Sequence, residues 1–256
     1  MTIPFSEEHW KQFCKTLGLK ESPLGIYYTR DKPEGITLKT GIHLCMIGFL
    51  KKARKNGKTV YFDKNHFGCP GGAYYMGFLE SPRPDIEYFL SCGIPGQMEG
   101  ERYVKTPELA RKYIEKVKPR PAPAPYCVFK PIEQFQRDEK PEIVVFFAPP
   151  DILSGLFTLT NYSLERTDGV YTPFGSGCSA ILTHPLKEAE KEDPRAILGM
   201  FDVSARPMVE KDTLTLSVPF PLFLGLLENA SGSFLQTGSW KKVLQRIQKQ
   251  KKEGGV

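Results

Sequence analysis

The two halves of the chain present the same order of structural signals, and this repetition constrains the fold more than any other feature. An apolar strand-like segment, 25–28 in one half and 143–147 in the other, leads through a proline-containing loop to an apolar helical segment. A second strand and a turn with a Gly-Cys pair follow in each half. Such alternation predicts an α/β (or α+β) fold of two related βαβ-containing halves, with a mixed sheet and helices on its faces. Internal duplication and chance recurrence of β-α-β units both explain the order.

Caps and apolar spacing predict the individual elements. Ser6 caps a first helix whose apolar face includes Trp10, Phe13 and Leu17 and places Cys14 in the core. The other expected helices cover residues 43–56, the segment from Pro107 onward, 151–162, a short stretch from about 177 that Pro185 ends, 221–230, and a basic segment from 240. Strands are expected over 24–29, 59–63, 143–148, 169–171, 198–204 and 214–218.

Four prolines in seven residues interrupt the chain at 119–125. Such a segment favours an extended, polyproline-like conformation. We therefore divide the chain into an N-terminal half, 1–118, this connector, and a C-terminal half, 126–256. The connector is equally compatible with a rigid strap on one compact domain.

Composition excludes several classes of protein. The formal net charge of +6 comes partly from the basic C-terminal segment, and no stacking aromatic residues or reader motif accompany it, which argues against nucleic-acid binding. Residues 1–6 lack the features of a secretory signal, and the longest apolar runs fall well short of the roughly 20 residues that span a bilayer. Six scattered cysteines predict free thiols, and together these features indicate a cytoplasmic protein without a membrane segment.

The turn Gly-Cys-Pro-Gly-Gly at residues 68–72 is the strongest candidate for a functional site. Gly68, Gly71 and Gly72 tolerate unusual backbone angles, so their N–H groups can turn toward the Cys69 sulfur or toward a bound anion. Gly177, in the second Gly-Cys turn, is expected to play the same part. These four glycines are predicted to contact a cofactor, and Cys69 is predicted to be an available thiolate.

Cys178 follows Gly-Ser-Gly at the expected start of another helix. The unpaired N–H groups and the dipole of a helix start lower the pKa of a thiol and favour anions. The alternative is a small buried residue at a tight turn. If the halves are duplicated, Cys69 and Cys178 occupy equivalent places and face one shared cleft.

The cysteines suggest a thiolate-ligated metal centre, either an iron–sulfur cluster or a transition metal. Since no compact cluster motif is present, its ligands would come from distant segments, namely Cys69, Cys178, Cys45 and Cys92. Cys45 follows His43 by two residues and His66 precedes Cys69 by three, spacings that are compatible with metal binding but weak.

Two metal-free readings remain open for the same residues. In one, Cys69 is the nucleophile of an enzyme, with His43 or His66 as its base. In the other, the cleft binds a small anionic ligand and catalyses no reaction. Tyr74, Tyr75 and Phe78 follow the first Gly-Cys turn and pack either against a flat ligand or in the core. The sequence contains no nucleotide-binding loop and no serine-hydrolase motif.

The cysteine turns resemble those of a family catalogued as domain of unknown function 169, which is largely archaeal and anaerobic-bacterial. The resemblance rests on Cys45 before a helix that ends at Gly57, on the run Gly-Cys-Pro-Gly-Gly-Ala at 68–73, and on Gly-Cys-Ser-Ala at 177–180. It extends from about Leu24 to the helix after Pro219. The family implies no particular reaction. It implies that the cysteine turns belong to a recurring architecture, in an anaerobic setting where an exposed iron–sulfur cluster would survive.

Overall fold

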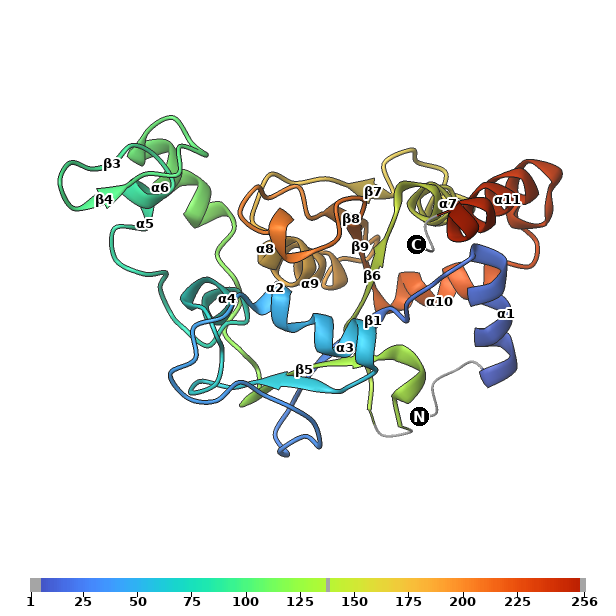
Figure 1. Ribbon diagram of the computed structural model, residues 1–256, viewed down its shortest axis with the longest axis horizontal. Helices are drawn as coiled ribbons and strands as arrows, with labels where there is room; N and C mark the ends of the chain where they lie inside the picture. Colours follow the sequence, from blue (N-terminus) through green and yellow to red (C-terminus); the bar gives the residue numbers. More distant parts are fainter. Residues whose placement is uncertain (1–5, 137–138, 254–256) are drawn as a thin grey trace.

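The computed structural model describes residues 6–136 and 139–253, and its centre is a seven-stranded sheet in the order β2-β5-β1-β6-β9-β8-β7 (Figure 1). The predicted α/β fold with a mixed sheet is confirmed, since β7 and β8 are parallel and the other pairs are antiparallel. The strands are β1 (Leu24–Thr29), β2 (Val60–Phe62), β5 (Tyr126–Pro131), β6 (Ile143–Ala148), β7 (Val170–Tyr171), β8 (Ala196–Gly199) and β9 (Leu214–Pro219). A separate two-stranded sheet contains β3 (Gly93–Ile94) and β4 (Met98–Glu99).

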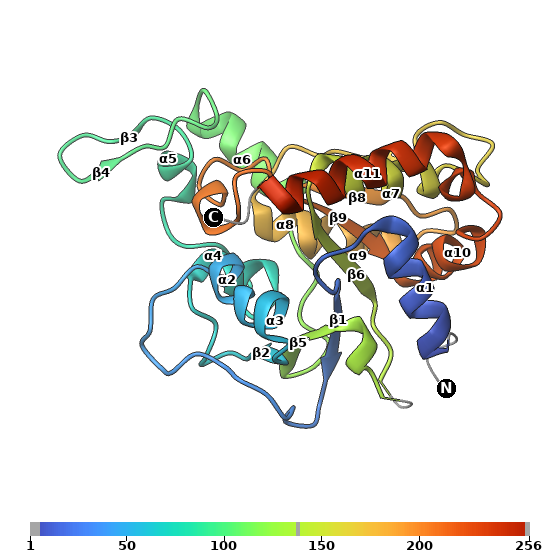
Figure 2. The same cartoon turned by 45° about the vertical axis from the view of Figure 1, so that its right-hand side comes forward.

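Helices cover both faces of the sheet (Figure 2). One face carries α1 (Glu7–Leu17), α7 (Pro150–Thr160), α10 (Phe220–Asn229) and α11 (Gly238–Glu253). The other carries α2 (Met46–Phe49), α3 (Lys51–Asn56), α8 (Gly177–Ile181) and α9 (Thr183–Ala189), with α4 (Pro70–Tyr75) beside them. Successive strand residues point to opposite faces, so Ile143, Val145 and Phe147 enter one core while Val144 and Phe146 enter the other. No helix within the described ranges has the length and apolar character required to cross a membrane.

The two halves of the sheet have matching strand registers on either side of the β1–β6 pair. Leu24, the first residue of β1, lies opposite Pro131 at the end of β5, and Ile143, the first residue of β6, lies opposite Pro219 at the end of β9. The pairing of β2 with β5 starts at Phe129, two residues before Pro131. The pairing of β8 with β9 starts at Ser217, two residues before Pro219. β1, β5 and β2 therefore correspond to β6, β9 and β8.

This correspondence changes the expected pairing of the two Gly-Cys turns. The paired short helices α2 and α3 come immediately before β2 along the chain, and α8 and α9 come immediately before β8 on the same face of the sheet. Cys45, the N-cap of α2, is thus the topological counterpart of Cys178 in α8. The expected equivalence of Cys69 with Cys178 is wrong, because α4 follows β2.

Several predicted element boundaries are also corrected. The helix expected over 43–56 begins only at Met46 and is divided at Leu50. Pro185 does not end a helix, because it lies in the first turn of α9, where a proline sacrifices no intrahelical hydrogen bond. The strand expected over 198–204 is β8, which ends at Gly199, and the chain beyond it leaves the sheet.

The proline-rich connector lies as a strap along the fold. β5, which follows the connector, pairs with β1 and β2 of the N-terminal half, so one continuous sheet includes strands from both sides of residues 119–125. The connector is fixed after α4, where the Ala122 N–H donates to the Gly77 carbonyl at 2.9 Å.

Between α4 and the connector the chain forms a projection that we call the arm, residues 81–118. It contains α5 (Ile86–Phe89), the β3–β4 hairpin and α6 (Pro107–Lys116), and Figure 1 shows it extending away from the sheet. Thr106 caps α6, with its side chain accepting from the Leu109 N–H. The arm lies on the side of the sheet that carries α4 and α8.

A buried ion pair on this face makes stability depend on pH. Arg54 of α3 is 5% exposed and pairs with Glu210 at 2.8 Å and with Glu21 at 3.0 Å. Partial burial alone would raise the pKa of Glu210, but its hydrogen bond from Arg54 lowers that pKa from 4.5 to about 2. The stability that this carboxylate contributes is therefore present above about pH 4.5 and is lost as the pH falls toward 2.

We expect the free energy of unfolding, measured with urea, to fall between pH 5.5 and pH 3.5, and to fall less in Glu210→Gln. Glu228→Gln removes an exposed carboxylate with no ion pair among the described residues and serves as the control. An unchanged pH dependence in Glu210→Gln would show that Arg54 does not act through this carboxylate.

Candidate functional site

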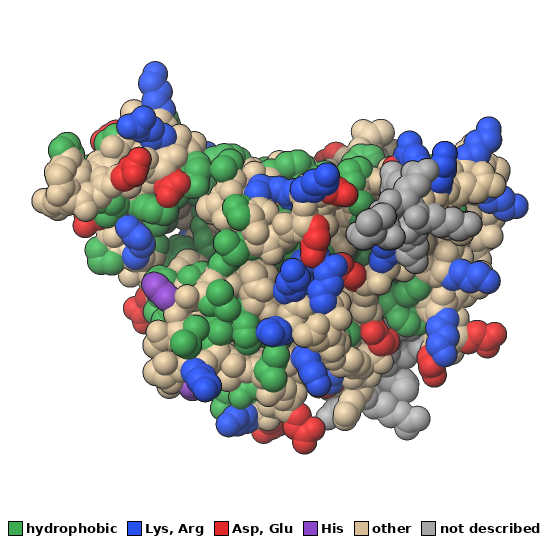
Figure 3. All heavy atoms as spheres, viewed as in Figure 1, with side chains coloured by type: hydrophobic (Ala, Val, Ile, Leu, Met, Phe, Trp, Pro, Cys, Tyr) green, Lys and Arg blue, Asp and Glu red, His purple; other side chains and the backbone are tan. Residues whose placement is uncertain are grey.

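A large cavity lies between the arm and the body of the protein, and we call it the arm pocket. Its volume is about 800 Å³, within the range of small-molecule sites. Figure 3 shows the hollow between the arm and the body, with hydrophobic side chains around it. Its walls come from the arm, from the N-terminal ends of α2, α4 and α8, and from the loop after β8.

Apolar and aromatic side chains dominate the lining of the arm pocket. On the arm side these include Ile86, Phe89, Tyr103, Val104, Tyr113 and Ile114. On the body side, the Phe174 ring lies 5.6 Å from the Tyr113 ring, which links the arm to the loop after β7. Three lining side chains remain largely exposed, namely Phe174 (67%), Phe201 (53%) and Val203 (68%). Such clustered apolar exposure is typical of a binding surface.

Cys69 lines this pocket and is the N-cap of α4. The proline expected in a tight turn is instead the first residue of this helix, where its fixed φ suits helical geometry. The Gly72 N–H donates to the Cys69 sulfur at 3.3 Å. The N–H of Met46, the first residue of α2, also donates to it, so two helix N-termini converge on one sulfur.

The surroundings of Cys69 stabilise its thiolate. A hydrogen bond from the Cys45 thiol is the largest cause, and the Met46 and Gly72 N–H groups and His43 add to it. These effects outweigh burial and lower the pKa of Cys69 to about 5. The pKa of Cys45 is raised in turn, because its proton is held by Cys69 and because it is partly buried. At neutral pH the pair therefore consists of a Cys69 thiolate and a protonated Cys45.

His43 is the polar residue at the edge of this group. Its Nδ1 lies 2.9 Å from the carbonyl oxygen of Gly68, and it lines the arm pocket. A carbonyl only accepts, so Nδ1 carries a proton and Nε2 is the free ring nitrogen of the neutral form. His66, the other predicted base, does not line the pocket, since its ring bonds to Asp63 at 2.9 Å and to Thr40 at 3.1 Å.

Cys178 also lines the arm pocket, as the shared-cleft hypothesis requires, but the expected lowering of its pKa is not found. Burial raises its pKa well above the ordinary value, and the negative charges of Cys69 and Asp202 raise it further. The N-cap of α8 is Ser176, whose hydroxyl accepts from the Ser179 N–H. Cys178 is therefore a neutral thiol facing the Cys69 thiolate.

The predicted glycines have different roles. Gly71 and Gly72 line the arm pocket, and a side chain at Gly71 would enter open space. Gly68, at φ +78°, does not line it, and a Cβ there would overlap the carbonyl oxygen of Leu44. The Gly177 N–H donates a hydrogen bond to the Asp202 carboxylate at 3.0 Å. Gly68 and Gly177 thus shape the turns without offering a free N–H to a ligand at the arm pocket.

The four predicted metal ligands do not come together. Cys45, Cys69 and Cys178 line the arm pocket, whereas Cys92 is exposed beside β3, where its thiol donates to the Gly93 carbonyl. Within residues 6–136 and 139–253, no group of three or more His, Cys, Asp or Glu side chains is arranged to hold a metal ion. The described arrangement does not fit a four-cysteine cluster.

Sequence reasoning missed much of the pocket. Tyr113 and Ile114 of α6 line the cavity, and they were not among the predicted site residues. Phe201, Asp202 and Met200 follow β8, and Met200 has the unusual φ of +72°. Residues other than glycine with a positive φ are strained and occur more often at functional sites than elsewhere. No local sequence signal marked these residues, because they become pocket walls only when the arm and the sheet edge meet.

Comparison with known proteins places the chain in a family. No match was found among curated proteins or among solved structures. A family model described as uncharacterised ArCR, domain of unknown function 169, matches residues 12–229. The match confirms the resemblance seen in the cysteine turns and includes Cys45, Cys69 and Cys178. Because it covers most of the sequence, this chain belongs to the family domain of unknown function 169.

Proposed function

We propose that this protein binds an extended, largely apolar small molecule in the arm pocket and that the Cys69 thiolate forms a covalent bond to an electrophilic carbon of that molecule. The observation that carries the proposal is the position of Cys69, which lines a largely apolar cavity of about 800 Å³ and whose sulfur accepts hydrogen bonds from two helix N-termini and from Cys45. Free thiols of this kind persist in a reducing compartment, so a cytoplasmic location is part of the proposal.

The pocket lining determines the class of ligand. Aromatic rings from the arm and from the loop after β7 offer flat apolar surfaces on both sides of the cavity. The exposed rings of Phe174 and Phe201 would lose contact with water when a ligand covers them, which favours binding by roughly 25 cal/mol for each Å² of apolar surface buried. A ligand with a substantial ring system or hydrocarbon chain fits this lining better than a small polar metabolite.

The state of Cys69 determines the class of reaction. The thiolate is the nucleophilic form of cysteine, and a lowered pKa keeps Cys69 in that form at neutral pH. In a substitution, a sulfur lone pair forms the S–C bond while the leaving group departs with the electrons of the broken bond. Cys69 therefore needs no separate base for this step, and His43 contributes by favouring the negative charge on sulfur.

The proposal predicts an unusual pH profile for alkylation. In anaerobically purified protein, we expect iodoacetamide to modify Cys69 at nearly the same rate at pH 6 and pH 8, because the thiolate population is nearly complete above its pKa of about 5. Mass spectrometry of the digested protein measures the rate at each cysteine, and the exposed Cys92 is the internal reference. A Cys69 rate that rises about tenfold for each pH unit between 6 and 8 would refute the thiolate assignment.

A second reagent tests the apolar pocket separately from the thiolate. N-phenyl iodoacetamide carries the same reactive carbon as iodoacetamide with an added aromatic ring. Relative to Cys92, we expect Cys69 to prefer the phenyl reagent, and Tyr113→Ala to weaken this preference by opening the contact between Tyr113 and Phe174. Equal preference at both cysteines would contradict an apolar ligand while leaving the thiolate result intact.

A thiolate-ligated metal centre, an iron–sulfur cluster included, is the second candidate. Cys45, Cys69 and Cys178 line one pocket, which favours it. With no group of three ligand side chains arranged for a metal in the described ranges, the bound molecule would have to supply the remaining ligands. Stoichiometric iron and sulfide in anaerobic protein, lost in Cys69→Ala, would support this candidate over the nucleophile, and metal-free protein with rapid Cys69 alkylation would reject it.

A further inference from the structure

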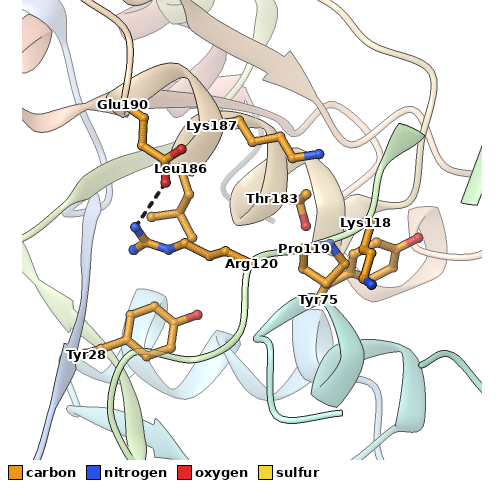
Figure 4. Close-up of a pocket in the computed structure, with 9 residues that line it drawn as sticks. All are labelled: Tyr28, Tyr75, Lys118, Pro119, Arg120, Thr183, Leu186, Lys187 and Glu190. Carbon is orange, nitrogen blue, oxygen red and sulfur yellow. Dashed lines mark hydrogen bonds and ion pairs between the residues drawn. The ribbon is translucent and has the colours of Figure 1, made fainter. Parts of the chain in front are cut away.

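A second, smaller cavity lies where the connector crosses α9, and we call it the connector pocket. Its volume is about 220 Å³, and its wall is formed by the connector, by α9, and by one tyrosine from each of β1 and α4. Figure 4 shows Lys118, the last residue of the arm, and Arg120 of the connector facing Thr183 and Lys187 of α9 and the following residue Glu190 across the cavity. Neither Cys69 nor any other cysteine lines it, so its role is independent of the arm pocket chemistry.

Positive charge predominates on this wall. Arg120 is neutralised by ion pairs with Glu142 and with Glu190, the latter at 3.4 Å. Lys118 and Lys187 have no ion-pair partner in the part of the chain that the structure describes, although the Lys187 ammonium donates to the Lys116 carbonyl at 3.1 Å. Desolvation lowers the pKa of Lys187, although the charge of Glu190 opposes this. An anion in the cavity would stabilise both ammonium groups.

An unsatisfied hydroxyl is the second observation. Thr183 is 2% exposed, and its Oγ1 has no hydrogen-bond partner within residues 6–136 and 139–253. In Figure 4 this oxygen points toward the connector, on the side of Pro119 and Lys118. The Nε of Arg120 is likewise buried without a partner there. A buried donor without a partner is energetically unfavourable, so an acceptor placed in the cavity would remove this cost.

We propose that the connector pocket binds a phosphate group, with the Thr183 hydroxyl as a hydrogen-bond donor and Lys118 and Lys187 as the charges that balance it. A phosphate carries about −1.5 to −2 charges at neutral pH and several acceptor oxygens, which matches two ammonium groups and an unpaired hydroxyl better than a single carboxylate does. Lys118 directly precedes the connector, and Pro119 and Arg120 of the connector line the same cavity, which gives the proline-rich strap a role in positioning a ligand.

The phosphate could be free or could belong to a larger molecule. Tyr75 lines both the connector pocket and the arm pocket, so the two cavities are neighbours on either side of one side chain. A comparison of the affinities for inorganic phosphate and for phenyl phosphate distinguishes a free phosphate from one that belongs to a larger molecule. Similar affinity for both indicates a site for the free anion, and a preference of about tenfold or more for the ester indicates the charged end of a longer ligand.

Isothermal titration calorimetry of the full chain with sodium phosphate, at constant ionic strength, tests the site. We expect saturable binding whose affinity falls at least tenfold in the double variant Lys118→Ala/Lys187→Ala. The control Lys241→Ala removes an exposed lysine of α11 on the other face of the sheet, and its affinity should equal that of the wild type. The absence of saturable binding of either phosphate compound, or equal affinity in all three proteins, would overturn the proposal.

Thr183→Val keeps the proposal testable if the lysine variant fails to fold. Valine has nearly the shape of threonine without the hydroxyl, so we expect this variant to bind phosphate more weakly. In phosphate-free buffer it should unfold at the same or a higher urea concentration than the wild type, because a buried unpaired hydroxyl is replaced by a methyl group. Marked destabilisation of phosphate-free Thr183→Val would show that the hydroxyl already has a partner within the protein, which would contradict the site.

Discussion

Replacement of Cys45 by alanine is expected to slow the alkylation of Cys69 at pH 6 by a factor of about ten or more. The hydrogen bond from the Cys45 thiol is the largest cause of the low pKa of Cys69, and without it the burial of the sulfur favours the neutral thiol. The Met46 and Gly72 N–H groups remain and keep part of the effect. The measurement is the rate of iodoacetamide modification at Cys69 from pH 4 to pH 9, whose midpoint should move to higher pH.

Two further variants make this result specific. Cys45→Ser retains a hydroxyl that can donate to the Cys69 sulfur, so it should recover much of the rate that Cys45→Ala loses. Cys14→Ala removes another half-buried cysteine, which packs with the core on the opposite face of the sheet, and should leave the profile unchanged. If Cys45→Ala alkylates like the wild type, the two helix N-termini alone stabilise the thiolate.

Replacement of Gly77 by alanine is expected to lower the free energy of unfolding by about 2–4 kcal/mol. Gly77 has φ +78°, which costs an alanine about 1–2 kcal/mol. A Cβ at this position would also overlap the Arg120 carbonyl and the Ala122 N–H, both of them backbone groups that cannot rotate away. The variant must therefore displace the connector from the end of α4. Urea unfolding monitored by circular dichroism measures the change.

A second glycine provides the matched control. Gly225 lies inside α10, and a Cβ there would meet no atom within 4 Å, so Gly225→Ala should stabilise the protein by roughly 0.5–1 kcal/mol through helix propensity. Because Gly77→Ala moves the wall that carries Lys118 and Arg120, it should also weaken phosphate binding. Equal effects of the two substitutions on stability would show that the connector is not held against α4.

The two proposed sites share one structural cause. The segment 63–125, which contains α4, the arm and the connector, is inserted between β2 and β5, whereas the corresponding strands β8 and β9 are joined by the much shorter segment 200–213. This insertion carries α4 with Cys69, the outer wall of the arm pocket, and Lys118 of the connector pocket. Both proposed sites therefore depend on this insertion, and the C-terminal half contributes the opposing walls.

Local sequence patterns determined the elements that are bounded by strong signals. β1 and β6 have the predicted limits, because apolar and β-branched runs between prolines and polar residues favour buried strands. The Ser6 cap fixed the start of α1 in the same way. The Gly-Cys-Pro-Gly-Gly turn also indicated Cys69 as the candidate thiolate, because its small residues leave backbone N–H groups free to reach the sulfur.

Tertiary structure alone decided what these elements do together. The chain order suggested that Cys178 matches Cys69, but strand register makes Cys45 its counterpart, and register depends on pairing between distant segments. Helix position suggested a low pKa for Cys178, but burial next to the Cys69 charge raises it. The sequence by itself therefore determined the α/β class, the main strands and the candidate nucleophile. The pocket, the thiolate and its partner Cys45 depend on contacts between residues far apart in the chain, which local patterns do not encode.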